Sequence, residues 1–305
     1  MRLGAWFAAA PNSTVGRSAD LHAITSEQLA EDNRRVSLPA RMIAWALLGT
    51  VVICAITGCG GPSNSAATTQ TTTTAASSTT SSKTWSIVAL GDSVPSGYNC
   101  NCTPFPQLSA QGLTSSTGQT VTATNDAVSG YTTANVLNQL QSDTKVMSDV
   151  SKADAVEINI GANDIPYNKN SCGTTVDCYT PFVSAMQKNL GAVVSRVHDL
   201  TSGHKVLVEL LDYWSIWLGG TYARKKGHDY ITTARQVTAQ VDSAIKSTAS
   251  QNGSAYVSVR RAFKGPSFGY IEDHYLTSDG DHPNATGHQA IASAAEAVIK
   301  DKLGI

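Results

Sequence analysis

Between residue 84 and the C-terminus, short apolar runs alternate with stretches of helical periodicity. Apolar runs of this length are typical of strands buried on both faces of a parallel sheet. They predict five strands, at 86–90, 121–125, 155–160, 205–211 and 255–259. Alternating strands and helices predict a parallel sheet that is covered by helices on both faces.

The intervening stretches predict helices near 132–148, 180–199 and 230–250, and a last helix that begins near Asn284, a good N-cap residue. Apolar side chains recur at helical spacing in three of these helices, so each is expected to bury one face. These side chains are Phe182, Met186, Leu190, Val193, Val194 and Val197 in the second helix, Val237, Val241, Ala244 and Ile245 in the third, and Ile291, Ala295, Val298 and Ile299 in the last.

The first part of the chain has a different pattern. Residues 1–41 form a mixed, polar extension that ends in a basic segment containing Arg34, Arg35 and Arg41. An apolar run follows over 42–58 and is shorter than the ~20 residues that a membrane-spanning helix needs. A basic segment ahead of a short apolar run indicates a signal peptide.

The apolar run ends in Ile56-Thr57-Gly58-Cys59, which resembles the lipobox of bacterial lipoproteins. The resemblance implies that Cys59 is lipidated, becomes the mature N-terminus and anchors the protein to the cell membrane, outside the cytoplasm. A plain membrane anchor and a secretory signal cut nearby are the alternatives. Ser, Thr, Ala and Gly dominate the residues after Cys59 and cannot build a core, so 59–83 is predicted to be a disordered tether. Residues 84–305 then form a single domain.

Composition narrows the possible partners. Hydrophobic residues make up 41% of the 305-residue chain, charged residues make up 15%, and the net charge is -1. This balance does not indicate a basic surface for nucleic acid or acidic lipids.

Four polar motifs lie at the ends of predicted strands or before the last helix. They are Gly91-Asp92-Ser93, Asn125-Asp126-Ala127-Val128-Ser129-Gly130, Gly161-Ala162-Asn163-Asp164 and Asp279-Gly280-Asp281-His282-Pro283. Ligands bind beyond the carboxyl ends of the strands in an open α/β sheet, so Ser93 stands where a nucleophile is useful.

The chemistry of a serine nucleophile explains the last motif. The Ser93 hydroxyl attacks a carbonyl carbon well only if a base removes its proton. His282 is the candidate base. Asp279, three residues earlier, is placed to fix the imidazole tautomer and to stabilise the imidazolium.

The four motifs, in this order, resemble those of the SGNH hydrolases, also called the GDSL esterase/lipase family. The resemblance implies a three-layer α/β/α sandwich with a central five-stranded parallel sheet, the flavodoxin-like fold of that family. It implies a serine esterase or lipase that needs no cofactor and no metal and that acts on a small-molecule, lipid or acylated-glycan ester. It also implies an oxyanion hole made by the backbone N–H groups of Ser93 and Gly130 and the side-chain amide of Asn163. We expect a monomer.

Four cysteines lie in the predicted domain. Because an exported protein favours disulfides, Cys100, Cys102, Cys172 and Cys178 are expected to pair. Cys172 and Cys178 flank a short loop and pair plausibly, whereas a bridge between Cys100 and Cys102 would be strained. Crossed pairing between the two loops is the alternative, and the spacing is poor for zinc.

Other sequence features offer weaker sites. Gly265-Pro266-Ser267-Phe268-Gly269 matches a G-x-S-x-G nucleophile elbow, but no helical stripe follows it. His274, Asp281, His282 and His288 do not share one helical face, which disfavours a metal site. Asp281 is expected to point to solvent and Asp92 to be structural.

The segment 212–218 is expected to line the mouth of the site, and Trp214 and Trp217 there could hold an acyl chain, stack on a sugar ring or simply pack. Two other functions use the same residues: an acyltransferase, and a non-catalytic lipoprotein that binds glycan or lipid in the cleft.

Overall fold

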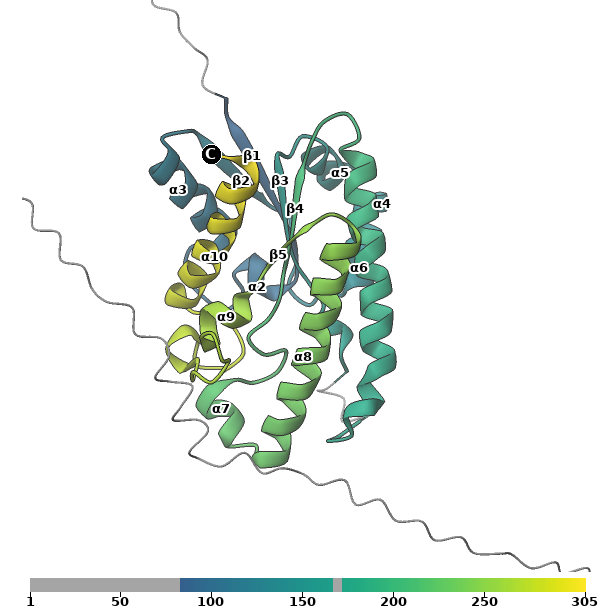
Figure 1. The fold of residues 1–305 in the computed structure, drawn as a ribbon, viewed down its shortest axis with the longest axis vertical. Coiled ribbons are helices and arrows are strands. Elements are labelled where there is room, and N and C mark those ends of the chain that lie inside the picture. Colours follow the sequence, from purple (N-terminus) through teal and green to yellow (C-terminus); the bar gives the residue numbers. More distant parts are fainter. Residues whose placement is uncertain (1–82, 167–171) are drawn as a thin grey trace, which may run out of the picture. The chain divides into compact units, whose positions relative to one another are not determined.

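A computed structural model describes residues 83–166 and 172–305 (Figure 1). Its centre is a five-stranded parallel sheet with the order β2-β1-β3-β4-β5. The strands are β1 (Trp85–Gly91), β2 (Val121–Asn125), β3 (Ala155–Asn159), β4 (Leu207–Leu211) and β5 (Ala255–Val257). All five lie on predicted strands: β2 has the predicted bounds, and the ends of the other four differ by at most two residues.

Helices cover both faces of this sheet. On one side lie α3 (Phe105–Thr117) and α10 (Ala285–Leu303), with α9 (Val259–Lys264) beside α10 (Figure 1). On the other side lie α4 (Thr133–Ser142), α6 (Thr180–Leu200) and α8 (His228–Gln251), with α5 (Thr144–Val150) next to α4 and α6. The predicted three-layer α/β/α sandwich is confirmed.

Short helical segments make up much of the remaining structure. They are α2 (Ser93–Ser96), η1 (Ala162–Asp164), η3 (Val176–Tyr179), α7 (Gly220–Arg224) and η4 (Asp273–Tyr275). Several of them follow the carboxyl ends of the strands, so they carry the side chains of the candidate site.

The core lies between the sheet and its helices. Residues Ile87–Leu90 of β1 are at most 2% exposed, as expected for a central strand covered on both faces. The predicted stripe of α8 is fully buried. The stripe of α6 is buried except for Phe182, which is 38% exposed, so its predicted inward position is wrong. The core takes the neighbouring Val183 instead.

One further helix prediction changes, and the predicted start of the last helix does not. The single helix predicted at 132–148 is two helices, because Asp143 ends α4 and caps α5 by accepting hydrogen bonds from the Lys145 and Val146 amides. The predicted N-cap Asn284 is confirmed: its side chain accepts a hydrogen bond from the Gly287 amide at 3.0 Å.

The predicted signal peptide, lipobox and linker, including Cys59, lie outside the described residues. Among residues 83–166 and 172–305, no helix is both long enough and apolar enough to cross a membrane.

Candidate active site

The turn after β1 places Ser93 at the carboxyl edge of the sheet. A side chain at Gly91 would collide with the Asn159 carbonyl oxygen, and φ is +148° there, so this position requires glycine. The carboxylate of Asp92 then caps α2 by accepting a hydrogen bond from the Val94 amide at 3.0 Å. Ser93 is thus the first residue of a short helix and lines a cavity.

His282 and Asp279 reach the same point from the loop before α10. The Nε2 atom of His282 lies 3.0 Å from Ser93 Oγ, and its Nδ1 atom lies 2.8 Å from Asp279 Oδ2. A hydrogen bond from the Thr277 amide to the His282 carbonyl, at 2.8 Å, closes the loop. The three side chains predicted to act together therefore form one hydrogen-bonded chain.

Asp279 is held by several further donors. Its Oδ1 atom accepts from the Thr277 hydroxyl at 2.7 Å, the Asp281 amide at 2.8 Å and the His282 amide at 3.0 Å. Partial burial alone would raise the pKa of Asp279, but the hydrogen bonds from His282, Thr277 and Asp281 outweigh it and hold the pKa well below its ordinary value. The carboxylate is therefore ionised over the whole physiological range.

Gly130 and Asn163 line the same cavity as Ser93 and His282. Nothing lies within 4 Å of where a Gly130 side chain would begin, so its backbone faces open space. Asn163 donates a hydrogen bond from Nδ2 to the Tyr131 carbonyl at 2.9 Å, next to Gly130 in the chain. Asp164 accepts one from the Thr133 amide at 2.9 Å. These contacts join the second and third motifs.

The cavity has a volume of about 560 Å³. Trp214, Ile216 and Trp217 form part of its wall, and Phe182 contributes an exposed ring. The two tryptophans are at most 5% exposed, and Trp214 stacks on Phe263 with ring centroids 4.4 Å apart. They therefore both pack in the core and line the cavity. Asp281, expected to face solvent, is half-buried and lines the cavity as well.

The sequence profile of the GDSL-like Lipase/Acylhydrolase family matches residues 89–290, which include all four motifs. The chain belongs to this family. It is thus an ester hydrolase of the GDSL type. No sequence among the curated proteins matches it.

Solved structures share the fold of this GDSL-type hydrolase. The lipase Lip_vut3 from a goat rumen metagenome is 23% identical with a TM-score of 0.58, over 70% of this chain and 96% of its own. Phospholipase A1 from Streptomyces albidoflavus NA297 is 23% identical with a TM-score of 0.52, over 72% and 99%. The lipase/acylhydrolase from Enterococcus faecalis is 20% identical with a TM-score of 0.50, over 72% and 96%.

Asp92 holds the turn that carries Ser93, the candidate nucleophile. It is 1% exposed, and its Oδ2 atom accepts a hydrogen bond from the Tyr213 hydroxyl at 2.5 Å. Desolvation raises the pKa of Asp92 to about 6, against the lowering effect of the hydrogen bonds from Tyr213 and Val94. With both oxygens engaged in holding α2 and the loop after β4, Asp92 has a structural position.

The cysteines pair within each loop and not across them. Cys100 bonds to Cys102 with Cα atoms 5.1 Å apart, and Cys172 bonds to Cys178 with Cα atoms 5.5 Å apart. The first pair was the less favoured one from spacing alone. The left-handed backbone of Asn99 and Asn101, at φ 60° and 50°, gives the sharp turning that brings the two cysteines together.

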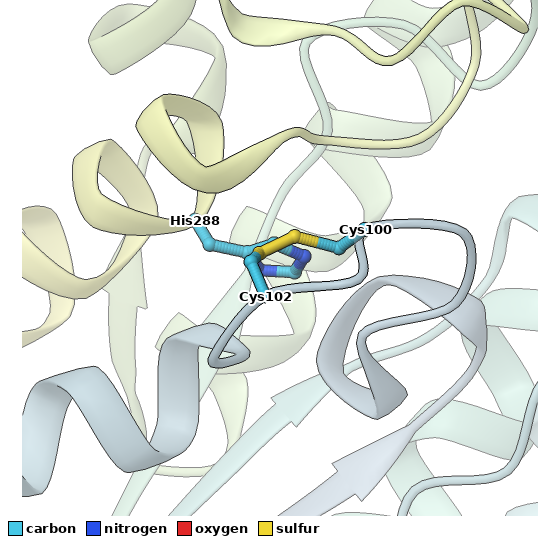
Figure 2. Close-up of side chains that lie close together, drawn as sticks. All are labelled: Cys100, Cys102 and His288. Carbon is cyan, nitrogen blue, oxygen red and sulfur yellow. A yellow bond between two sulfur atoms is a disulfide. The ribbon is translucent and has the colours of Figure 1, made fainter.

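Three of the weaker candidates from the sequence, Ser267, His274 and His288, do not line the catalytic cavity, whereas Asp92, Asp281 and His282 do. Ser267 is exposed in a turn after α9, and no helix follows it, so the elbow geometry is absent there. His274 packs on Tyr275 with ring centroids 3.7 Å apart. His288 is buried against the Cys100–Cys102 disulfide (Figure 2).

Sequence reasoning missed the contribution of the loop after α2. Tyr98 packs its ring edge-on to His282 with centroids 4.9 Å apart, and Asn99 contacts Asp279. These residues come from a segment without periodicity and outside the four motifs. The only local signal is the Cys-Asn-Cys sequence, whose spacing argued against a bridge between Cys100 and Cys102 and gave no sign of a contact with Asp279 or His282.

Proposed function

We propose that this GDSL-type hydrolase is a serine esterase that cleaves carboxylic esters through an acyl-Ser93 intermediate. The observation that carries the proposal is the unbroken chain of hydrogen bonds from Ser93 Oγ through the His282 ring to Asp279, at 3.0 and 2.8 Å. Such a chain is what a serine needs in order to lose its proton as it attacks.

In the first half of the reaction, Ser93 Oγ attacks the ester carbonyl carbon while His282 Nε2 takes the hydroxyl proton. Asp279, which accepts a hydrogen bond from Nδ1, stabilises the resulting imidazolium and fixes the ring orientation. The tetrahedral intermediate then collapses, and His282 returns the proton to the leaving alkoxide. An alcohol departs and the acyl group remains on Ser93.

The negative oxygen of the tetrahedral intermediate needs donors on the opposite side from His282. The backbone N–H groups of Ser93 and Gly130 and the Asn163 amide are the proposed donors. All three residues line the same cavity, which supports this assignment. Because α2 begins at Ser93, the Ser93 amide is one of the free N–H groups of a helix start.

In the second half, water enters the cavity and loses a proton to His282 as its oxygen attacks the acyl carbon. Ser93 leaves with the proton from His282, and the carboxylic acid is released. No other group is consumed, so the balanced reaction is ester plus water to acid plus alcohol.

The size and the lining of the cavity indicate the class of substrate. About 560 Å³ lies in the range of small-molecule sites, and its walls combine aromatic rings with polar groups. The structural relatives include a lipase and a phospholipase A1, and both are ester-cleaving enzymes. We propose small carboxylic esters, lipids or acylated glycans as the substrates.

The test is hydrolysis of p-nitrophenyl acetate and butyrate by the full chain, together with labelling by a fluorophosphonate probe. Ser93→Ala should lower kcat/KM by about 10⁴-fold or more and abolish labelling. Ser267→Ala is the matched control, because this exposed serine stands in the alternative elbow motif, and it should behave as wild type. Equal activity of wild type and Ser93→Ala would end the proposal, as would an active Ser93→Ala with an inactive Ser267→Ala.

A further inference from the structure

The loop between α2 and α3 crosses from the nucleophile to the Asp279–His282 loop. Its first residues are tied to the nucleophile, because the Tyr98 amide donates to the Ser93 carbonyl at 3.0 Å. At the next residue, Asn99 Nδ2 lies 2.6 Å from Asp279 Oδ2 and 3.4 Å from Thr277 Oγ1. One short loop therefore contacts all three members of the triad.

The hydrogen bond from Asn99 ends on the Asp279 oxygen that also accepts from the His282 ring. Oδ1 already has three donors, so Asn99 completes a set of five donors around this carboxylate. Asn99 touches neither the nucleophile nor the cavity. Its effect on the reaction must therefore pass through Asp279.

The backbone around Asn99 has a conformation that requires support. Asn99 and Asn101 both adopt the left-handed region, at φ 60° and 50°, which costs free energy for residues other than glycine. The Cys100–Cys102 disulfide lies between and beside these two residues. By closing the loop covalently, it restricts the chain to this turn.

The disulfide lies against the ring of His288, a residue of α10 (Figure 2). The His288 Nδ1 atom accepts a hydrogen bond from the Phe105 amide at 3.2 Å, which fixes the start of α3. Burial, the largest cause, and the nearby His282 lower the pKa of His288 to about 4, so the ring is neutral.

A metal does not fit Cys100, Cys102 and His288. In a neutral ring whose Nδ1 atom accepts a hydrogen bond, Nε2 carries the proton and has no lone pair for a cation. The two sulfurs are bonded to each other. The cluster is therefore an anchor for the loop.

We propose that Asn99 is a positioning residue for Asp279, and that the Cys100–Cys102 disulfide holds the loop that presents Asn99. This inference rests on the proposed esterase function. The hydrogen bond from Asn99 stabilises the negative charge of Asp279 and limits rotation of the carboxylate. The His282 ring therefore stays aligned with Ser93.

The main test replaces Asn99 by glycine, which accommodates the left-handed backbone and removes the side chain with the amide that donates to Asp279. With p-nitrophenyl acetate, Asn99→Gly should lower kcat/KM by about tenfold, as for loss of a hydrogen bond to a charged group. The midpoint of the acidic limb of the kcat/KM profile should move to higher pH, because a less neutralised Asp279 favours the imidazolium. A residue that only fills space would not move this midpoint.

The matched control is Asn101→Gly. Asn101 has the same residue type, the same loop and the same left-handed backbone, and its side chain makes no hydrogen bond within the described part of the chain. It should keep wild-type activity and the wild-type acidic limb. A second variant, Asn99→Asp, keeps size and backbone preference but sets a carboxylate against Asp279, and should move the acidic limb further than Asn99→Gly.

The disulfide is tested by the double variant Cys100→Ser/Cys102→Ser, which should move the acidic limb in the same direction as Asn99→Gly. Cys172→Ser/Cys178→Ser should not move it. Circular dichroism and thermal melting establish that each variant is folded. An unchanged acidic limb in both Asn99 variants would overturn the inference, and so would equal effects of Asn99→Gly and Asn101→Gly. Wild type with neither hydrolysis nor Ser93 labelling would instead overturn the esterase proposal itself.

Discussion

Asn163 is the only proposed oxyanion donor that a substitution can remove, because Ser93 and Gly130 would donate from the backbone. Its side chain is exposed in the cavity, and its one hydrogen bond goes to the Tyr131 carbonyl. The amide has two N–H groups, so one can hold the loop while the other faces the substrate. A substitution of Asn163 therefore tests the proposed oxyanion hole directly.

Asn163→Ala should lower kcat for p-nitrophenyl butyrate by about 10²–10³-fold, which is typical for the loss of one oxyanion donor. The KM should change little, because the donor acts on the transition state more than on the bound ester. Steady-state kinetics measure both values, and thermal melting serves as the folding control. A variant with wild-type kcat would remove Asn163 from the proposed oxyanion hole.

Single residues also show where sequence reasoning stops. Ser93, His282 and Asp279 could be predicted because strand ends and the spacing before α10 bring them together, and the distances bear out that geometry. Asn99 could not be predicted, because its contact with Asp279 spans 180 positions and depends on the turn that the disulfide shapes. Long-range contacts of loops leave no periodic pattern in a sequence.

At the scale of elements, the pairing of β3 with β4 places two acidic residues in the core. Glu157 and Glu209 are register partners, and both are 0% exposed. Among the described residues, none of their four carboxylate oxygens accepts a hydrogen bond of regular geometry. Desolvation raises the pKa of Glu157 to about 8; the nearby Ser109 hydroxyl offsets this only in part, and the charge of Glu296 adds to it. Burial and the charge of Glu157 raise the pKa of Glu209 well above its ordinary value.

The pair makes folding depend on pH. Below the ordinary pKa of about 4.5, the folded and unfolded chains both hold the Glu157 proton. As pH rises toward 8, the unfolded chain loses this proton while the folded chain keeps it, so the free energy of unfolding falls. Between these pH values the difference in bound protons at Glu157 is about one, which makes the free energy of unfolding fall by about 1.4 kcal/mol per pH unit. Glu157→Gln should remove this contribution to the slope.

Urea denaturation at pH 5, 6, 7 and 8 measures this slope. Asp229→Asn is the matched control, because the Asp229 side chain is 87% exposed and should leave the slope unchanged. The absolute stability of Glu157→Gln is a separate matter, since the glutamine amide also needs partners. Identical slopes for wild type and Glu157→Gln would mean that Glu157 is ionised in the folded protein.

Strands and helices were predicted correctly where a long apolar pattern marks the buried face. They were missed where small or polar side chains set the buried face or the helix end. The five strands and the helices α6, α8 and α10 carry long apolar patterns, and these gave their positions. α3 was missed because its buried face is built partly from small or polar residues such as Ser109 and Ala110. The break between α4 and α5 depends on the Asp143 cap, which a helical stripe does not reveal.

At the scale of the whole molecule, we propose that a lipid on Cys59 tethers the catalytic domain to a membrane surface. The support is the order of basic segment, apolar run, cysteine and Ser/Thr-rich stretch ahead of residue 84. An acyl chain contributes about 0.8 kcal/mol per buried CH₂, so two chains on one cysteine hold a protein at a membrane. A flexible stretch after the cysteine would leave the cavity free to meet substrates beyond the surface.

Cys59→Ala should abolish incorporation of a fatty-acid label and release the protein from the membrane fraction of expressing bacterial cells. Cys54→Ala is the matched control, because Cys54 lies in the same apolar run but outside the lipobox-like residues, and it should keep both label and membrane partitioning. Neither change should alter kcat/KM on a soluble ester, since both positions precede the catalytic domain. If Cys59→Ala retained the label and stayed with the membrane, another segment would have to be the anchor, and the lipoprotein interpretation would be wrong.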